Sequence, residues 1–296
     1  GSDGVTAGSG GGLVNPDETY PVPDAASLKD EDGSSLWLRY PQVPIPGRLA
    51  EYQAAFTSVV SAVDTPSVDA AEAELVLGLS GLTGKTVQVA AAVGGAGGVV
   101  LGTATSAAIK DLPLVARLTP LGPEGYLIER AEVSGQTVTV VAGNSDIGVL
   151  YGAFALLRHL QMHQGIAELS LSGSPKIKNR LLNHWDNLDG SVERGYAGKS
   201  IWGWANLPGS ASSAVFKNYA RANASIGING AVLTNVNASP LSLTAPYIKK
   251  AAALADIFRP YGIRVYLSVR FSAPIEIGGL KTADPLNPAV RAWWKA

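Results

Sequence analysis

The stretch INGAVLTN (228–235), together with IRVYLSVR (263–270), decides the fold class of this chain. Both are short runs with apolar residues on both faces of an extended strand, and a third run, LLNHW (181–185), precedes them. Apolar residues at helical spacing lie between the runs, at about 214–226 and 246–261. Strands that are apolar on both faces and alternate with helices predict an α/β fold with a parallel sheet and crossover helices.

The region from 176 to 296 therefore holds three strand–helix units, and a last helix is expected to begin near 287. A closed eight-unit barrel takes roughly 250 residues, so three units cannot close one. A bare sheet of three strands would expose its edges and its apolar faces. Two architectures stay open from spacing alone: the first three βα units of a TIM (β/α)8 barrel that is truncated here, and a small open α/β domain.

Strands and a helix also alternate earlier in the chain. The runs 125–129 and 137–141 predict two strands that are joined by a turn at 134–136. Residues 147–162 follow with their apolar side chains near one face, which predicts an amphipathic helix. Ser145 and Asp146, at the start of this helix, are both candidates for its N-terminal cap. Strands followed by a packed helix indicate a small α/β domain.

Two further segments belong to this first region. Helical spacing runs from 50 to 62, and the apolar run ELVLGL at 74–79 predicts a strand. Together these patterns predict that residues 31–175 form an α/β accessory domain ahead of the strand–helix units at 176–296. Residues 1–30 are polar and rich in Gly, Pro and Asp, and they predict a flexible N-terminal arm.

Composition narrows the function classes. Hydrophobic residues make up 46% of the chain and charged residues 16%, which is enough apolar material for a sizeable core. The net charge of −1 argues against nucleic acid or an anionic membrane as a partner. The sequence contains no run of 18 or more apolar residues, which is the length that would predict a membrane span. It also contains no cysteine, which excludes thiol catalysis and cysteine-bound zinc. No signal peptide is visible, so cytoplasmic, periplasmic and secreted locations all stay open.

Long polar strings in the second region are distinctive enough to be recognised. They are NHWDNLDGSVERGYAGKSIW (183–202), YARANASIGINGAVLTNVN (219–237), FRPYGIRVYLSVRFSAP (258–274) and GGLKTADPL (278–286). Together they resemble the front of the catalytic domain of the glycoside hydrolase family 67 α-glucuronidases, over essentially 176–296. The first region fits less distinctively and resembles the accessory α/β domain that precedes several glycosidase barrels.

The resemblance implies an inverting hydrolase that releases (4-O-methyl-)glucuronic acid from a xylo-oligosaccharide bearing it. Inversion needs a carboxylic acid and a separate carboxylate base, roughly 6.5–9.5 Å apart. In this family the acid follows the fourth strand and the base comes later, so no catalytic residue is carried over to this chain. The resemblance thus predicts a fragment that is inactive alone and that uses no cofactor and no metal. A homodimer of the full-length parent stays open.

The candidate substrate-binding residues lie where the predicted strands end, because active sites of such barrels form at the carboxyl ends of their strands. The resemblance supports Trp185 and Val236 as walls of the glucuronate pocket. The guanidinium of Arg194 could hold a carboxylate or a hydroxyl through its two-pronged face. The remaining candidates can hydrogen-bond sugar hydroxyls from the same loops, and they are Asp186, Glu193 and Asn235.

Plainer interpretations of these residues stay open beside the functional ones. Trp185 could be a structural residue at the rim, and Val236 could pack in the core. Glu193 and Arg194 could pair with each other at the surface, and Asp186 could be bound by backbone amides in its own turn.

Other chemical interpretations were weighed and disfavoured. Two carboxylate pairs, Asp186 with Glu193 and Glu276 with Asp284, lie in loops, and the family places its acid and base elsewhere. His159 and His163 are four residues apart on a helix but have no evident third ligand, so decoration of the helix C-terminus is favoured over a metal site.

Two other functions compete with an enzyme fragment. The chain could be a non-catalytic carbohydrate-binding or scaffold protein that keeps the sugar-contacting loops. It could also be one half of a split enzyme whose other half is a second chain. Sugar binding without turnover favours the carbohydrate-binding protein. The native mass distinguishes the split enzyme, because it would include a second chain.

Overall fold

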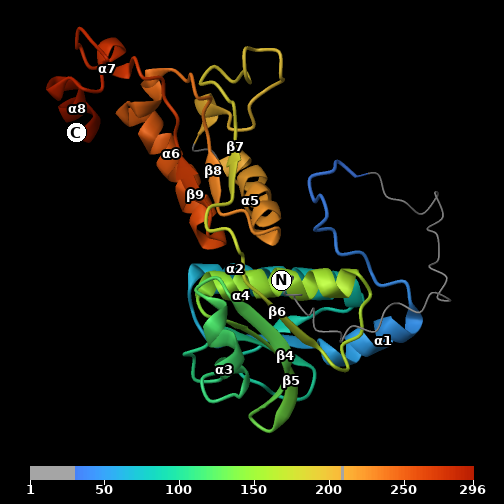
Figure 1. Cartoon of the computed structure of the whole chain (residues 1–296). Helices are drawn as coiled ribbons and strands as arrows, with labels where there is room; N and C mark the ends of the chain where they lie inside the picture. Colours follow the sequence, from blue (N-terminus) through green and yellow to red (C-terminus); the bar gives the residue numbers. More distant parts are fainter. Residues whose placement is uncertain (1–30, 208–209) are drawn as a thin grey trace, which may run out of the picture. The chain divides into compact units, whose positions relative to one another are not determined.

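The computed structural model describes residues 31–207 and 210–296, so the predicted arm at 1–30 lies outside the described residues. The chain splits into two compact units, Gly1–Lys176 and Ile177–Ala296. Each is a mixed α/β unit with parallel strands (Figure 1), which confirms the predicted fold class at this level. Among the described residues, no helix is both long enough and apolar enough to cross a membrane.

The first unit is built on a six-stranded sheet in the order β2-β1-β3-β5-β4-β6. The strands β2, β1, β3 and β5 are mutually parallel, whereas β4 runs antiparallel to both β5 and β6. The bounds are β1 Ser58–Ser61, β2 Gln88–Val89, β3 Gly98–Thr103, β4 Tyr126–Val133, β5 Gln136–Gly143 and β6 Ser170–Gly173. The central strands β3 and β5 are almost wholly buried, as expected for strands that are covered on both faces.

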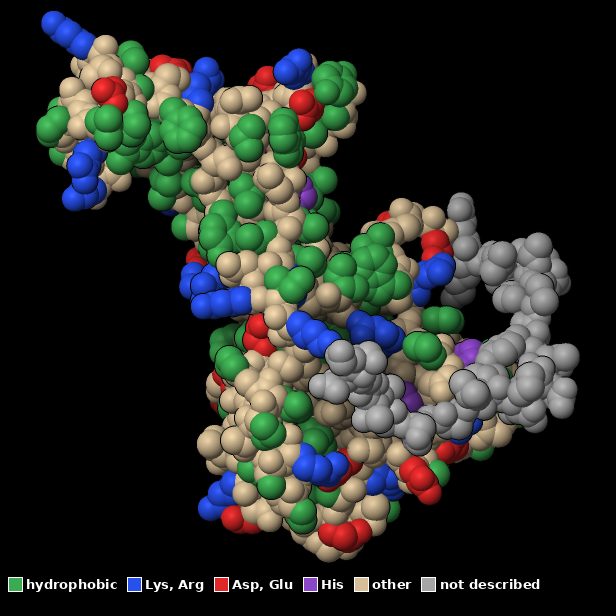
Figure 2. All heavy atoms as spheres, viewed as in Figure 1, with side chains coloured by type: hydrophobic (Ala, Val, Ile, Leu, Met, Phe, Trp, Pro, Cys, Tyr) green, Lys and Arg blue, Asp and Glu red, His purple; other side chains and the backbone are tan. Residues whose placement is uncertain are grey.

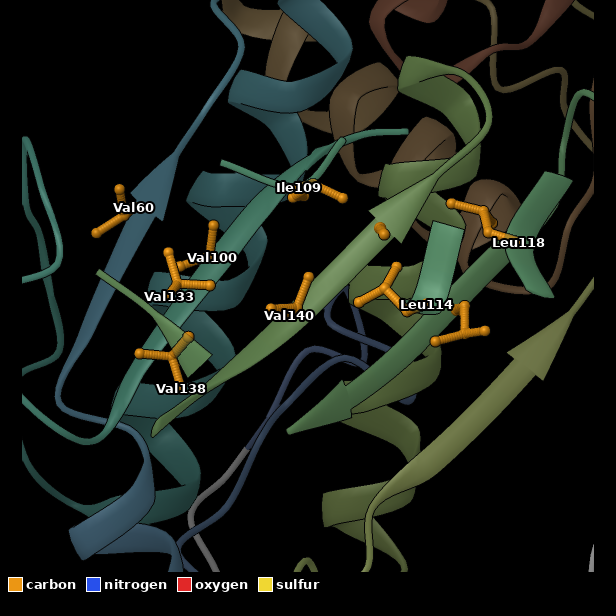
Figure 3. Packing of buried hydrophobic residues seen from close by; sticks show 10 residues of the cluster. Val60, Val100, Ile109, Leu114, Leu118, Val133, Val138 and Val140 are labelled. Carbon is orange, nitrogen blue, oxygen red and sulfur yellow. The ribbon is translucent and has the colours of Figure 1, made fainter. Parts of the chain in front are cut away.

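Helices cover both faces of this sheet. Helices α2 (Pro66–Thr83) and α4 (Asp146–Gln161) pack against each other, and a Cβ on Gly78 of α2 would lie 2.4 Å from a methyl carbon of Leu157 in α4. The opposite face packs against α3 (Leu114–Leu118) and the turns before it. Figure 3 shows this second layer, which comprises Val60, Val100, Ile109, Leu114, Leu118, Leu127, Val133, Val138, Val140 and Ala142.

The predicted hairpin and the helix that follows it are confirmed. Strands β4 and β5 pair around Ser134 and Gly135, both with positive φ (53° and 73°), which is typical of a two-residue hairpin turn. The Oγ of Ser145 accepts a hydrogen bond from the Gly148 amide (3.3 Å) and caps α4. Of the two candidates from the sequence, Ser145 is the cap and Asp146 is the first residue of the helix.

Two predictions for the first unit are wrong. The run 74–79 is not a strand but the middle of α2, which Thr65 caps and Gly84 ends at φ 66°. Buried residues recur at helical spacing along the whole helix, and this longer period overrides the short apolar run. The helix expected at 50–62 is α1, Pro46–Ala55, and β1 takes up its second half.

The second unit has a three-stranded parallel sheet in chain order, β7-β8-β9. Its strands are β7 Leu181–Asn183, β8 Gly230–Val232 and β9 Arg264–Tyr266, with α5 (Ser210–Ser225) and α6 (Ala245–Phe258) as the crossover helices. A 3-10 turn, Arg259–Tyr261, continues α6, and Gly262 ends it with φ 70°, as is typical of a glycine that closes a helix. The chain continues into α7 (Ala273–Glu276) and α8 (Pro288–Lys295), whose cap is Asn287. The predicted strand–helix alternation is therefore confirmed.

The core of the second unit is aromatic. Trp202 is fully buried, and its ring lies 4.8–6.2 Å, centroid to centroid, from those of four neighbours, His184, Phe216, Tyr219 and Phe258. The outer strands of the sheet are less covered: Leu181 and Tyr266 keep 41% and 38% of their surface. Hydrophobic side chains also gather on the visible surface around α7 and α8 (Figure 2).

Candidate functional site

The candidate site is the edge of the second sheet where the three parallel strands end. The chain continues past β7 at His184, past β8 at Leu233 and past β9 at Leu267. Hydrogen bonds join the segments just beyond: the Asn235 amide donates to the Asp186 carbonyl (2.9 Å), and the Thr234 hydroxyl donates to the Ser268 carbonyl (2.8 Å). These bonds hold the three strand ends together as one surface.

The loop after β7 folds back on itself. Isolated bridges join Asp186 to Val192 and Ser191 to Lys199, so residues 186–199 form a short ribbon. At its base the amide of Glu193 donates to the carbonyl of Trp185 (2.8 Å). The fold-back therefore brings Glu193, eight positions further along the chain, beside Trp185.

The side chains at this edge divide into an exposed set and a buried set. Trp185 and Val236 keep 38% and 43% of their surface, and Arg194 is also exposed. Glu193 is half-buried, whereas Asp186 and Asn235 are 4% and 6% exposed. The structure thus brings Trp185, Asp186, Glu193 and Asn235 into one hydrogen-bonded network, with Val236 and Arg194 as the next residues along their loops.

Glu193 has an unusual backbone. Its φ is 59°, in the left-handed region that residues with a Cβ rarely adopt. Its carbonyl accepts hydrogen bonds from the side-chain amides of Asn187 (2.8 Å) and Asn235 (3.4 Å). Asn187 was not among the residues predicted from the sequence, and only its place beside the Asp189–Gly190 turn marks it there.

Below the surface lies a polar group built on His184. Its Nε2 is 2.8 Å from the Tyr219 hydroxyl, and its Nδ1 is 4.0 Å from the Asp186 carboxylate. Burial lowers the pKa of His184 while the charge of Asp186 acts in the opposite direction, and burial together with Asp186 raises the pKa of Tyr219. The imidazole and the phenol are therefore both neutral near pH 7. The side chains below Asp186 are thus polar but carry no charge.

The disfavoured carboxylate pair at the far end of the unit is engaged elsewhere. Glu276 accepts from the Ser272 hydroxyl and lies 3.7 Å from the Arg270 guanidinium. Asp284 accepts from the Leu286 amide (2.9 Å) in the turn before α8. Glu276 is therefore held beside the segment that follows β9, whereas Asp284 is held in the turn before α8, so the two carboxylates serve different segments.

No metal centre emerges from the part of the chain that the structure describes, where no three His, Cys, Asp or Glu residues lie close enough to hold an ion. The Nε2 of His159 lies 2.9 Å from the carbonyl of Gly165 and serves the end of α4.

Comparison with known proteins follows the same division of the chain. Residues 36–156 match the family model "Glycosyl hydrolase family 67 N-terminus", and residues 159–296 match "Glycosyl hydrolase family 67 middle domain". Both models describe parts of glycoside hydrolases, which is the class that the resemblance in the sequence implied. The chain belongs to glycosyl hydrolase family 67 and carries its N-terminal and middle domains, so the resemblance seen in the sequence is confirmed.

The similar curated proteins carry one name. The chain is 35% identical over 269 residues to "Probable alpha-glucuronidase A" of Aspergillus terreus and 35% identical over 277 residues to "Alpha-glucuronidase A" of Emericella nidulans. Each alignment covers 89% of this chain and 31% of the relative. The chain therefore spans about a third of the length of the curated relatives that it matches.

A solved structure shares the fold at much lower identity. A GH138 enzyme targeting pectin rhamnogalacturonan II aligns with a TM-score of 0.52 and 17% identity, covering 80% of this chain and 28% of its own. At this identity the likeness concerns the fold alone.

Proposed function

We propose that this chain is part of an α-glucuronidase that releases (4-O-methyl-)glucuronic acid from glucuronoxylan oligosaccharides with inversion, and that it supplies one wall of the sugar pocket. The relatives named α-glucuronidase A support the activity. The observation that carries the local assignment is the backbone pairing of Trp185 with Glu193, which brings an exposed tryptophan and a half-buried glutamate together at the strand ends. A flat apolar ring next to polar acceptors suits a sugar, whose rings are apolar on their faces and polar at their edges.

We further propose that residues 176–296 begin a (β/α)8 barrel, with 31–175 as its accessory domain. The strands β7, β8 and β9 pair in chain order with a helix after each of the first two, which is how such barrels begin. Leu181 on β7 and Tyr266 on β9 are exposed side chains on edge strands, as expected where further strands pair.

Each candidate residue takes a role that agrees with its exposure. Trp185 and Val236 form apolar walls, and Arg194 binds the glucuronate carboxylate through paired N–H donors. Glu193 accepts a sugar hydroxyl. Asp186 and Asn235 are almost fully buried, so they act from behind this surface and hold the loops that carry the exposed residues.

We do not assign the catalytic acid or base to this part of the protein. The segments just past β8 and β9, residues 233–240 and 267–275, contain no Asp or Glu. The loop after β7 brings Glu193 and Asp186 to the strand ends, and there Asp186 is buried beside His184. Glu276, which directly follows the segment past β9, accepts from Ser272 and lies 3.7 Å from the Arg270 guanidinium. Accordingly the 296-residue chain alone is expected to bind the substrate without turning it over. Turnover after fusion to the remaining portion of the Aspergillus terreus relative would separate this proposal from a protein that only binds sugar.

Calorimetry with a glucuronic-acid-substituted xylotriose and with plain xylotriose tests this proposal. Preferential binding of the substituted sugar is expected, and Trp185→Ala and Arg194→Ala should each weaken it by about tenfold or more. Trp37→Ala is the matched control, because Trp37 is an exposed tryptophan of the first unit (49% against 38% for Trp185), and it should leave the affinity for both sugars unchanged. Equal affinity for both sugars would contradict the pocket, and glucuronate release by the chain itself would contradict the absence of catalytic groups.

A further inference from the structure

The feature that the proposed function leaves unexplained is the set of amides around the Glu193 backbone. We infer that Asn187 and Asn235 are positioning residues: they hold Glu193 in its left-handed conformation and thereby set where its carboxylate meets a sugar hydroxyl. The inference rests on the proposed function, because it concerns the same surface. It adds a specific task for two side chains that do not themselves face the sugar.

The conformation needs support because it is unfavourable for glutamate. At φ 59° the Cβ of an L-residue crowds its own carbonyl, so an unconstrained loop would place glycine or asparagine here. Glutamate in this state persists only when its surroundings over-determine it, and such residues cluster at functional sites. The structure shows three bonds that do so, one to the amide of Glu193 and two to its carbonyl.

Asn187 is itself oriented by a directional chain of hydrogen bonds. The Ser191 hydroxyl donates to the Asp189 carboxylate (2.7 Å), so its free lone pair accepts from Nδ2 of Asn187 (3.0 Å). The same Nδ2 reaches the Glu193 carbonyl at 2.8 Å. An ionised Asp189 offers only acceptors, so this series of hydrogen bonds can run in one direction only. It turns the N–H side of the Asn187 amide toward the Glu193 carbonyl.

Asn235 supplies the second amide from a different strand. Its Oδ1 accepts from the Asn237 amide (2.9 Å), which leaves Nδ2 facing the Glu193 carbonyl (3.4 Å). Its own backbone amide binds the carbonyl of Asp186 (2.9 Å). One residue therefore ties the loop after β8, which carries Val236, to the loop after β7, which carries Glu193. The exposed residues of the two loops are thus set in register with each other.

The chemistry suggests an almost isosteric test. Replacing either asparagine by aspartate keeps the shape but turns the donor into an anionic acceptor that faces a carbonyl oxygen. We expect Asn187→Asp to release Glu193: its amide should exchange about tenfold faster, and its 13Cα and 13Cβ shifts should move from left-handed toward extended values. Asn235→Asp should act in the same direction but more weakly, because its hydrogen bond is longer.

A double-mutant cycle separates positioning from general damage to the fold. Asn187→Asp should weaken binding of glucuronic-acid-substituted xylotriose by about tenfold in the unchanged chain, yet by less than about twofold when Glu193→Ala is already present. The control is Asn218→Asp on α5, where the side chain only accepts a hydrogen bond from Arg221 (2.9 Å) and aspartate accepts equally well. It should leave both the Glu193 signals and the affinity unchanged.

The outcomes distinguish this inference from the proposed function. If the unchanged chain does not bind the oligosaccharide, the proposed function fails, and the Glu193 signals alone decide whether the two asparagines hold its backbone. Unchanged Glu193 signals in Asn187→Asp would overturn the inference. An equal loss of affinity with and without the Glu193 carboxylate would also overturn it, because the effect of Asn187 would then not pass through Glu193.

Discussion

The two units of the chain pack their sheets to different degrees. In the first unit the central strands β3 and β5 are almost wholly buried between helices. In the second, β7 is exposed at all three positions and β9 at two of three. Among the described residues, five of the large exposed hydrophobic side chains lie in the first unit and 17 in the second, although the second is the smaller unit. The first unit therefore completes its own core, whereas the second draws its stability from an aromatic cluster on one side of an uncovered sheet.

The candidate site lies in the second unit, at the carboxyl ends of its parallel strands, where α/β sheets commonly bind ligands. The second unit keeps its strand ends open, and polar loops meet there over a core that Trp202 and its neighbours make rigid. The aromatic cluster around Trp202 is therefore the main support of the loops that form the candidate site.

The largest effect is expected for Trp202→Ala. Trp202 is fully buried and contacts four aromatic rings, so its removal should destabilise the second unit by about 3–5 kcal/mol and leave the first unit folded. Hydrogen exchange read by mass spectrometry distinguishes the units, since exchange should rise only at 177–296. Trp202→Phe is the control: it keeps a ring and removes an indole N–H that has no hydrogen-bond partner within the described chain, so it should cost less. Loss of protection in both units would contradict their independence.

The next prediction compares a buried leucine of the first unit with an exposed leucine of the second. Leu79 on α2 is fully buried, and Leu79→Ala should cost about 2–5 kcal/mol in urea unfolding of the first unit. Leu181 on β7 keeps 41% of its surface, and Leu181→Ala should stay within about 1 kcal/mol. Equal losses at the two positions would show that the second sheet is covered in solution.

The sequence predicted the second unit better than the first for a physical reason. Its strands are short apolar runs, and β8 and β9 each follow a helix and a glycine with positive φ, Gly227 and Gly262. In the first unit the run 74–79 is equally apolar but lies inside an 18-residue helix. There a buried Glu74, bonded to the Tyr40 hydroxyl (2.6 Å), marks a position that a local reading of apolar residues cannot explain.

The candidate site was accessible to sequence reasoning only in part. The rule that parallel strands end at one edge was enough to group Trp185 with Asn235, because it depends on strand order alone. The role of Asn187 was not accessible, because its amide meets the Glu193 carbonyl only through the ribbon at 186–199 and the left-handed turn of Glu193. Bonds from a side chain to the backbone across a loop leave no periodic trace in the sequence.

A smaller effect is expected for Glu193→Gly. Glycine adopts positive φ without crowding, so the change should stabilise the second unit by about 1 kcal/mol. The same change removes the carboxylate that we assign to a sugar hydroxyl, so stability should rise while affinity for the substituted xylotriose falls. Ser134→Gly in the β4–β5 turn is the matched control, since it relieves a similar φ of 53° in the first unit and should leave sugar binding unchanged. A destabilised Glu193→Gly would mean that its backbone is not strained.

The smallest effect is a pH dependence confined to the second unit. Burial lowers the pKa of His184 below its ordinary value of 6.5, so the folded state resists a proton that the unfolded chain accepts. The stability of the second unit should therefore fall as pH drops from about 6.5 toward the lowered pKa and level off below it. His184→Gln, which can still hydrogen-bond Tyr219, should flatten this slope, whereas His159→Gln in the first unit should not. Asp186→Asn removes the charge that favours the imidazolium, so it should extend the slope to lower pH; a slope that shortens instead would exclude Asp186 as the group that opposes the burial of His184.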